Sequence, residues 1–141
     1  MKNMVYEGLG FPVMLQGVRT EVIHGEELPI LDHADLERRV FEALLWSPHR
    51  LSGAELLFAR GFMRKTQASL ASAIGLKTHS MISQWENRNH EATGMDPTME
   101  NAIRMLMADH VGQLQSYALK ISLEVIRGNL ADPRPVEINV A

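Results

Sequence analysis

Apolar residues recur every three or four positions through most of the chain after residue 31, which is the spacing of one face of an α-helix. The pattern predicts six helices, at residues 32–46, 52–63, 66–74, 79–87, 96–110 and 113–127. The second helix begins at a capping box, because Ser52 is followed three residues later by Glu55. Gly75 is placed to end the third helix in the left-handed conformation, and Gly128 and Asn129 to close the last.

The two ends of the chain show a different pattern. Residues 13–15 and 18–23 are short β-prone runs on either side of Gln16 and Gly17, and this glycine can supply the positive φ of a tight hairpin turn. Residues 136–140 alternate between apolar and polar, as a strand does. The sequence therefore predicts a mainly α fold whose helical core has a small N-terminal β-hairpin and a C-terminal strand.

Composition narrows the classes of protein that this chain can belong to. The 141 residues are 45% hydrophobic and 22% charged, as in a globular protein, and no apolar stretch approaches the ~18 residues of a membrane-spanning helix. The N-terminus lacks the apolar core of a secretory signal, so we expect a cytoplasmic protein without membrane contact. Cysteine is absent and the six histidines have no paired metal-binding spacing, so we expect no metal site. Phosphate-loop and hydrolase motifs are absent too, so we expect neither a cofactor nor an enzyme.

The net charge of −3 is unevenly distributed along the chain. Residues 1–46 carry four basic side chains and eight acidic ones, and residues 94–141 carry four and six. Residues 47–93 reverse the balance, with six basic side chains and three acidic ones. A basic middle between acidic flanks indicates an anionic partner for the middle alone, although a solvated basic face explains the charge equally well.

Two short helices joined by a glycine turn at residues 66–87 predict a helix-turn-helix. The run TQASLASAIG at residues 66–75, followed by ISQWEN at residues 82–87, resembles the Xre-type, phage-repressor-like family. The pattern of that family is S/T-Q-x-x-L-A-x-x-x-G and then V/I-S-x-W-E-N, and the resemblance covers about residues 52–107. The turn at residues 76–78 is one residue longer than the usual form, which leaves the register of the recognition helix open by one position.

In a helix-turn-helix the N-terminal half of the second helix enters the major groove of DNA. The residues that this register turns toward the bases are His79, Ser80 and Gln84. Glutamine can bind N6 and N7 of adenine together, whereas serine and histidine can meet several bases. A shift of the register by one position would bring Met81 or Ser83 into this role instead.

The residues predicted to hold the DNA backbone are Thr66, Gln67, Lys77, Thr78, Asn87 and Arg88. The resemblance implies that Gln67 donates to a phosphate, since glutamine does so at this position in the family. It also implies an ion pair between Arg60 and Glu86, with Trp85 as a packing residue. Each of these polar side chains by itself is equally typical of a solvated protein surface. It is their place within the motif that favours contact with DNA.

These observations predict a regulator of transcription that binds a double-stranded operator as a homodimer, because short operators are two-fold symmetric. Residues 1–31 form the N-terminal extension, residues 32–110 the helical domain, and residues 111–141 the segment expected to form the dimer. The β-rich start is also similar to antitoxin-type regulators, although their zinc-binding branch uses cysteines that this chain lacks. The alternative is therefore an antitoxin-like protein that chiefly binds a partner toxin and binds DNA for its own regulation.

Overall fold

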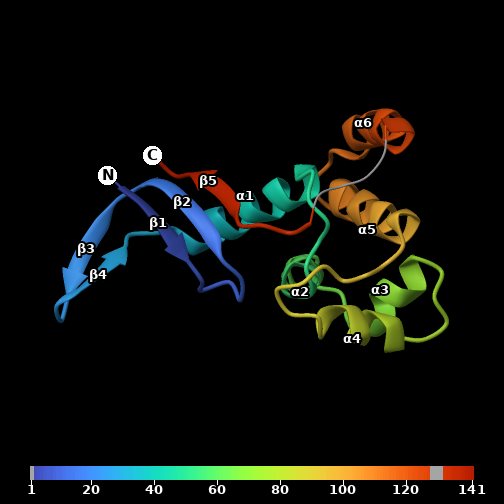
Figure 1. Cartoon of the computed structure of the whole chain (residues 1–141), viewed down its shortest axis with the longest axis horizontal. Coiled ribbons are helices and arrows are strands. Elements are labelled where there is room, and N and C mark those ends of the chain that lie inside the picture. The colour runs from blue at the N-terminus through green and yellow to red at the C-terminus, as the bar shows by residue number, and fades with distance from the viewer. Residues whose placement is uncertain (1, 128–131) are drawn as a thin grey trace.

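The computed structural model describes residues 2–127 and 132–141. The strands are β1 (Lys2–Tyr6), β2 (Val13–Val18), β3 (Thr20–Ile23), β4 (Glu26–Pro29) and β5 (Val136–Asn139). The helices are α1 (His33–Trp46), α2 (Gly53–Phe62), α3 (Gln67–Ala73), α4 (Ser80–Glu86), α5 (Pro97–His110) and α6 (Leu114–Arg127). The strands gather at one end of an elongated molecule and α2–α6 at the other, with α1 running between them (Figure 1).

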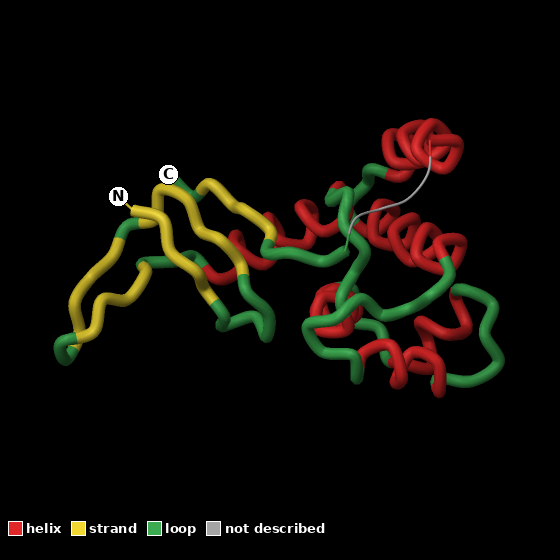
Figure 2. The backbone as a smooth tube through the Cα atoms, in the orientation of Figure 1, coloured by secondary structure: helices red, strands yellow, loops and turns green. Residues whose placement is uncertain are grey.

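The fold is mixed α/β, so the expectation of a mainly α fold was wrong. Strands from both ends of the chain form a three-stranded sheet in the order β1-β2-β5, and β3 and β4 form a separate two-stranded sheet (Figure 2). β5 runs parallel to β2, with Val13 opposite Val136 and Leu15 opposite Ile138. The short β1 and β5 gain their order by pairing with β2, a contact between chain ends that no local pattern reveals.

The predicted hairpin turn at Gln16 and Gly17 was also wrong, because β2 runs straight through both residues. Gly17 has the positive φ that the turn required, +70°, but it lies where the register between β1 and β2 shifts, as in a β-bulge. A Cβ at Gly17 would lie 2.5 Å from that of Ala141, so the close approach of the C-terminus also requires glycine here. The tight turn forms at His24 and Gly25, between β3 and β4.

α1 covers the three-stranded sheet, and the apolar residues that recur every three or four positions along it are all buried: Leu36, Val40, Phe41, Leu44 and Leu45. The alternate residues of β5, Val136 and Ile138, are buried with them. This contact makes both ends of the chain part of one hydrophobic core. α1 thereby connects the sheet to the helical part of the molecule.

The predicted helix starts are confirmed at three positions. The Asp32 side chain accepts from the amide of Asp35, 3.2 Å away, at the start of α1. The capping box of Ser52 and Glu55 is complete, with bonds of 2.9 and 3.1 Å. Asp96 caps α5 just before Pro97. The predicted end of α6 at Gly128 and Asn129 lies outside the described residues.

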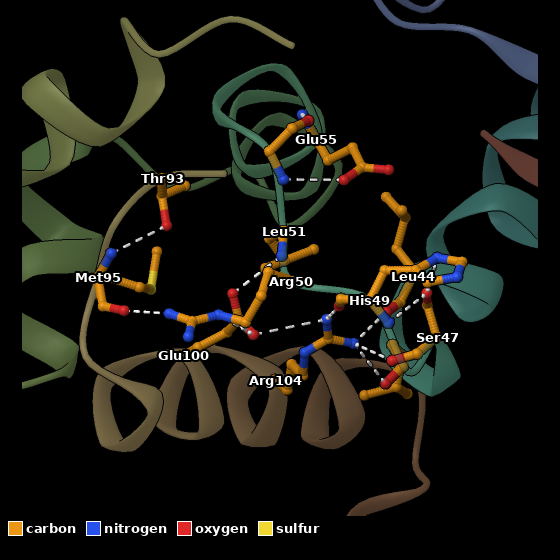
Figure 3. A network of polar contacts seen from close by, with 12 residues as sticks. Leu44, Ser47, His49, Arg50, Leu51, Glu55, Thr93, Met95, Glu100 and Arg104 are labelled. Atoms are coloured by element: carbon orange, nitrogen blue, oxygen red, sulfur yellow. Dashed lines mark hydrogen bonds and ion pairs between the residues drawn. The ribbon is translucent and has the colours of Figure 1, made fainter. Parts of the chain in front are cut away.

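A buried polar network joins α1 to α5 (Figure 3). Arg104 of α5 is 1% exposed, although the sequence gives α5 an amphipathic pattern in which a charged residue is expected outside. Its guanidinium donates to the carbonyls that end α1 and begin the next loop, those of Leu44, Leu45, Ser47 and His49. Leu44 and Leu45 are in the last turn of α1, whose carbonyls lack the partners of a continuing helix, and Ser47 is its C-cap. Arg104 therefore closes the C-terminal end of α1.

Glu100, one turn before Arg104 in α5, completes this network. Its carboxylate accepts from the amide of Leu51 at 2.9 Å and lies 3.3 Å from Nε of Arg50. The segment that leads from α1 to α2 is thus tied to α5 by charged side chains (Figure 3). α2 begins directly after this anchored segment, at its N-cap Ser52.

Candidate nucleic-acid interface

α3 ends in a Schellman motif. The amide of Leu76 donates to the carbonyl of Ala71 at 2.8 Å, and that of Gly75 to the carbonyl of Ser72 at 3.2 Å. Gly75 has a φ of +84°, as the motif requires. Leu76 then packs against the core, so the chain reverses within a few residues and leads into α4.

α4 is held against α2 through its inner face. Trp85 is buried in the core, as predicted, and Ile82 is buried beside it on the same helix. At Gly53, the first residue of α2, an added Cβ would lie 2.5 Å from the carbonyl oxygen of Trp85 and 2.6 Å from that of Glu86. Only glycine lets the start of α2 approach the end of α4 this closely. The orientation of α4 is therefore fixed by backbone contact as well as by side chains.

The predicted ion pair between Arg60 and Glu86 is present. Nε of Arg60 lies 2.6 Å from one carboxylate oxygen of Glu86, and Nη2 lies 3.0 Å from the other, which is a two-pronged pair. Arg60 also donates to the carbonyl of Lys65 at 3.1 Å. The side-chain amide of Gln67 donates to the carboxylate of Glu86 at 3.0 Å. One buried carboxylate thus joins α2, the turn after it, α3 and α4.

The outer face of α4 is polar. The predicted base-contacting residues are all exposed: His79, Ser80 and Gln84. His79 is the N-cap of α4, and its side chain makes no capping bond. Ser80 and Gln84 lie one turn apart on the side opposite Ile82. Of the two alternatives, Met81 is exposed and Ser83 is half-buried.

The predicted backbone-contacting residues fall into two groups. Lys77, Asn87 and Arg88 are exposed at the two ends of α4. The other three have partners within the protein: Thr66 caps α3 at 3.0 Å from the amide of Ser69, Thr78 bonds the hydroxyl of Ser80, and Gln67 bonds Glu86. The structure therefore gives Gln67 a role in positioning α3 against α4, which the sequence did not reveal.

The exposed charge around α3 and α4 is positive. Four cations here form no ion pair with any residue that the structure describes: Arg64, Lys65, Lys77 and Arg88. Of the three carboxylates in residues 47–93, Glu86 is paired and Glu55 is buried in its capping box, where burial raises its pKa above the usual 4.5. Glu91 is the carboxylate that faces solvent. The basic middle of the chain is thus a basic surface.

Sequence reasoning did not select Arg64 and Lys65 as site residues. They lie in the turn that leads into α3, directly before its N-cap Thr66. Two adjacent basic residues just ahead of a helix start were the signal available, because phosphate favours that end of a helix. They extend the basic surface from α4 to the start of α3.

Comparison with protein-family models, curated proteins and solved structures found no match to this chain. In the part of the chain that the structure describes, no helix is long and apolar enough to cross a membrane. The same residues bring together no group of three or more side chains suited to a metal ion. The case for a function therefore depends on the α3–α4 surface itself.

Proposed function

We propose that this protein binds double-stranded DNA in a sequence-specific manner and regulates transcription as a homodimer. The observation that carries this proposal is the α3–α4 unit, in which the network around Glu86 holds α4 with its polar face outward. Cationic side chains without ion-pair partners among the described residues surround that face, and their charge is complementary to that of the DNA phosphates. A short helix with exposed Ser80 and Gln84 suits the major groove, where base edges offer hydrogen-bond partners.

Two groups of residues on this surface have different roles: one contacts base edges, and the other fixes the position of the protein on the DNA. Gln84 and Ser80 reach base edges from the middle and the first turn of α4. Lys77 and Arg88, at the two ends of α4, bind phosphates on opposite sides of the groove. Contacts to phosphates set affinity and register but carry no sequence information. Gln67 acts through Glu86, by holding the two helices in their relative orientation.

Exchange of Gln84 for alanine tests this division. Selection from random duplexes first yields the preferred site, and affinities are then measured at one salt concentration. Gln84→Ala is expected to cost ~1–3 kcal/mol of binding free energy on that site and to reduce the sequence preference at one base pair.

Lys77→Ala is expected to weaken binding to preferred and random duplexes alike, and to reduce the slope of log affinity against log salt concentration by about 1. Glu37→Ala, at an exposed polar residue of α1, is the control and should change neither.

The proposed homodimer uses the outer face of α6. Leu119 and Leu123 lie one turn apart on this helix and are 73% and 54% exposed. The opposite face of α6 is already used, because Tyr117 is buried against Trp46 of α1, with ring centres 5.7 Å apart. A second copy that brings the same two leucines to a two-fold axis would cover both sets, as an isologous interface does.

Glutamate at both Leu119 and Leu123 is expected to convert the dimer to a monomer, because like charges would meet at the two-fold axis. Sedimentation gives the mass, and operator affinity should fall with it, since two half-sites are no longer bound together. Leu57→Glu, at an exposed leucine of α2, is the control. An unchanged dimer in the double variant would place the interface elsewhere. Removal of residues 113–141 is a poorer test, because it also takes β5 from the sheet.

A second candidate function is the binding of a partner protein through the β3–β4 hairpin, as an antitoxin-like protein would do. This hairpin projects from the sheet end of the molecule (Figure 1), and its apolar side chains are exposed at Val22, Ile23, Leu28 and Ile30. Glu21 and Glu26 lie directly across the hairpin from Leu28 and Ile23. Failure of the unaltered protein to bind any duplex at low salt would favour this function over the first.

A further inference from the structure

Met81 stands out on the surface of α4. It lies in the first turn of the helix and is 42% exposed, whereas the other outward side chains of α4 are polar. At 3.6 residues per turn, Met81 and Gln84 are about 60° apart around the helix axis, so they are neighbours on adjacent ridges. The sequence pattern placed Met81 only as an alternative to its neighbours, but in the structure it is exposed together with them.

The chemistry of a thioether limits what Met81 can contact on DNA. Its sulfur donates no hydrogen bond and accepts one only weakly, so a methionine gains little from phosphates or from the polar groups on base edges. The apolar group that the major groove presents is the C5-methyl of thymine, which is covered by apolar side chains in protein–DNA complexes. Methionine is unbranched and flexible, and it adapts to small apolar surfaces.

From this geometry we infer that Met81 is a specificity-determining residue that covers the C5-methyl of one thymine in each half-site. The inference rests on the proposed DNA binding and names part of its target. The thymine lies in a base pair next to the one that Gln84 reads, because the two side chains are neighbours on α4. Where Gln84 binds adenine, the two contacts together select adjacent A·T pairs, one by hydrogen bonds and one by the methyl group.

Exchange of single thymines for deoxyuridine tests the inference directly, because this removes the methyl group and leaves the base pairing intact. The preferred duplex of the 141-residue chain is first identified by selection from random duplexes, and each thymine in a half-site is then replaced in turn. At one position, the deoxyuridine duplex is expected to bind the protein about fourfold more weakly than the thymine duplex. Burial of one methyl group contributes ~0.8 kcal/mol, and a tenfold change in affinity corresponds to about 1.4 kcal/mol.

The affinities of the Met81→Ala and Met105→Ala variants for the same duplexes are then measured. Met105 is an exposed methionine on α5 and serves as the matched control. Met81→Ala should bind the thymine and deoxyuridine duplexes equally at the sensitive position, whereas Met105→Ala should keep the fourfold difference. Wild-type protein that binds its site but tolerates deoxyuridine everywhere would overturn the methyl contact alone. Equal sensitivity in Met81→Ala would overturn it too, and a wild-type protein that binds no duplex would overturn DNA binding as well.

Discussion

Arg104→Ala is expected to destabilise the protein by about 3–5 kcal/mol, the cost of breaking a buried charged network by removing one partner. The guanidinium is 1% exposed and donates to four carbonyls at and after the end of α1. Alanine would remove the guanidinium donor from the carbonyls of Leu45, Ser47 and His49, whereas the carbonyl of Leu44 would keep its bond from the amide of Ser47. The carboxylate of Glu100 would also lose a nearby cation. The effect should be largest at the junction of α1 with α5, where the two halves of the molecule meet.

Chemical denaturation measures this change in the free energy of unfolding. Arg38→Ala is the matched control, because Arg38 lies on the exposed face of α1 and pairs with Asp35 and Glu42 in solvent. Such exposed pairs contribute only ~0–1 kcal/mol, so this variant should unfold almost as the wild type does. Similar losses in the two variants would mean that Arg104 is solvated rather than buried in the protein in solution.

Glu86→Ala is expected to cost about 3 kcal/mol of stability and to abolish most sequence-specific DNA binding. The carboxylate is the acceptor for both Arg60 and Gln67, so its loss leaves a largely buried guanidinium without a counter-charge. It also removes the hydrogen bond by which Gln67 of α3 is joined to α4. The second effect follows because the base-reading side chains act only from a correctly oriented helix.

The companion variants separate the two effects. Glu91→Ala, at an exposed carboxylate five residues along the chain, should leave both stability and binding nearly unchanged. Arg60→Ala combined with Glu86→Ala should cost less than the two single changes added together, because the second removal takes away an already unpaired group. DNA affinity is compared at a temperature at which every variant is folded. Wild-type affinity in a folded Glu86→Ala variant would show that the network does not orient α4.

The sequence by itself determined the features whose causes lie within a few residues along the chain. Capping residues such as Ser52 and Asp96 mark helix starts because they satisfy the amides of the next turn, and Gly75 marks a helix end because it tolerates a positive φ. The buried faces of the helices follow from apolar spacing alone. The pairing of Arg60 with Glu86 was predicted through the resemblance, because both residues belong to one motif.

Only the tertiary structure decided the features that join distant segments. The alternating pattern at residues 136–140 predicted a strand, but only the structure shows that β5 pairs in parallel with β2. Gly17 lies at a shift of register within β2 rather than in a turn, because β2 continues through it and pairs with β1 on both sides of the shift. From the sequence, Arg104 and Glu100 would be expected on the surface of α5, but in the structure both are buried beneath the end of α1 and the loop that follows it. Gln67 likewise turns to Glu86 only when α3 and α4 are brought together. The physical reason is common to all four: a strand, a buried charge or an amide is stabilised by its partner, and local sequence does not show which partner folding will supply.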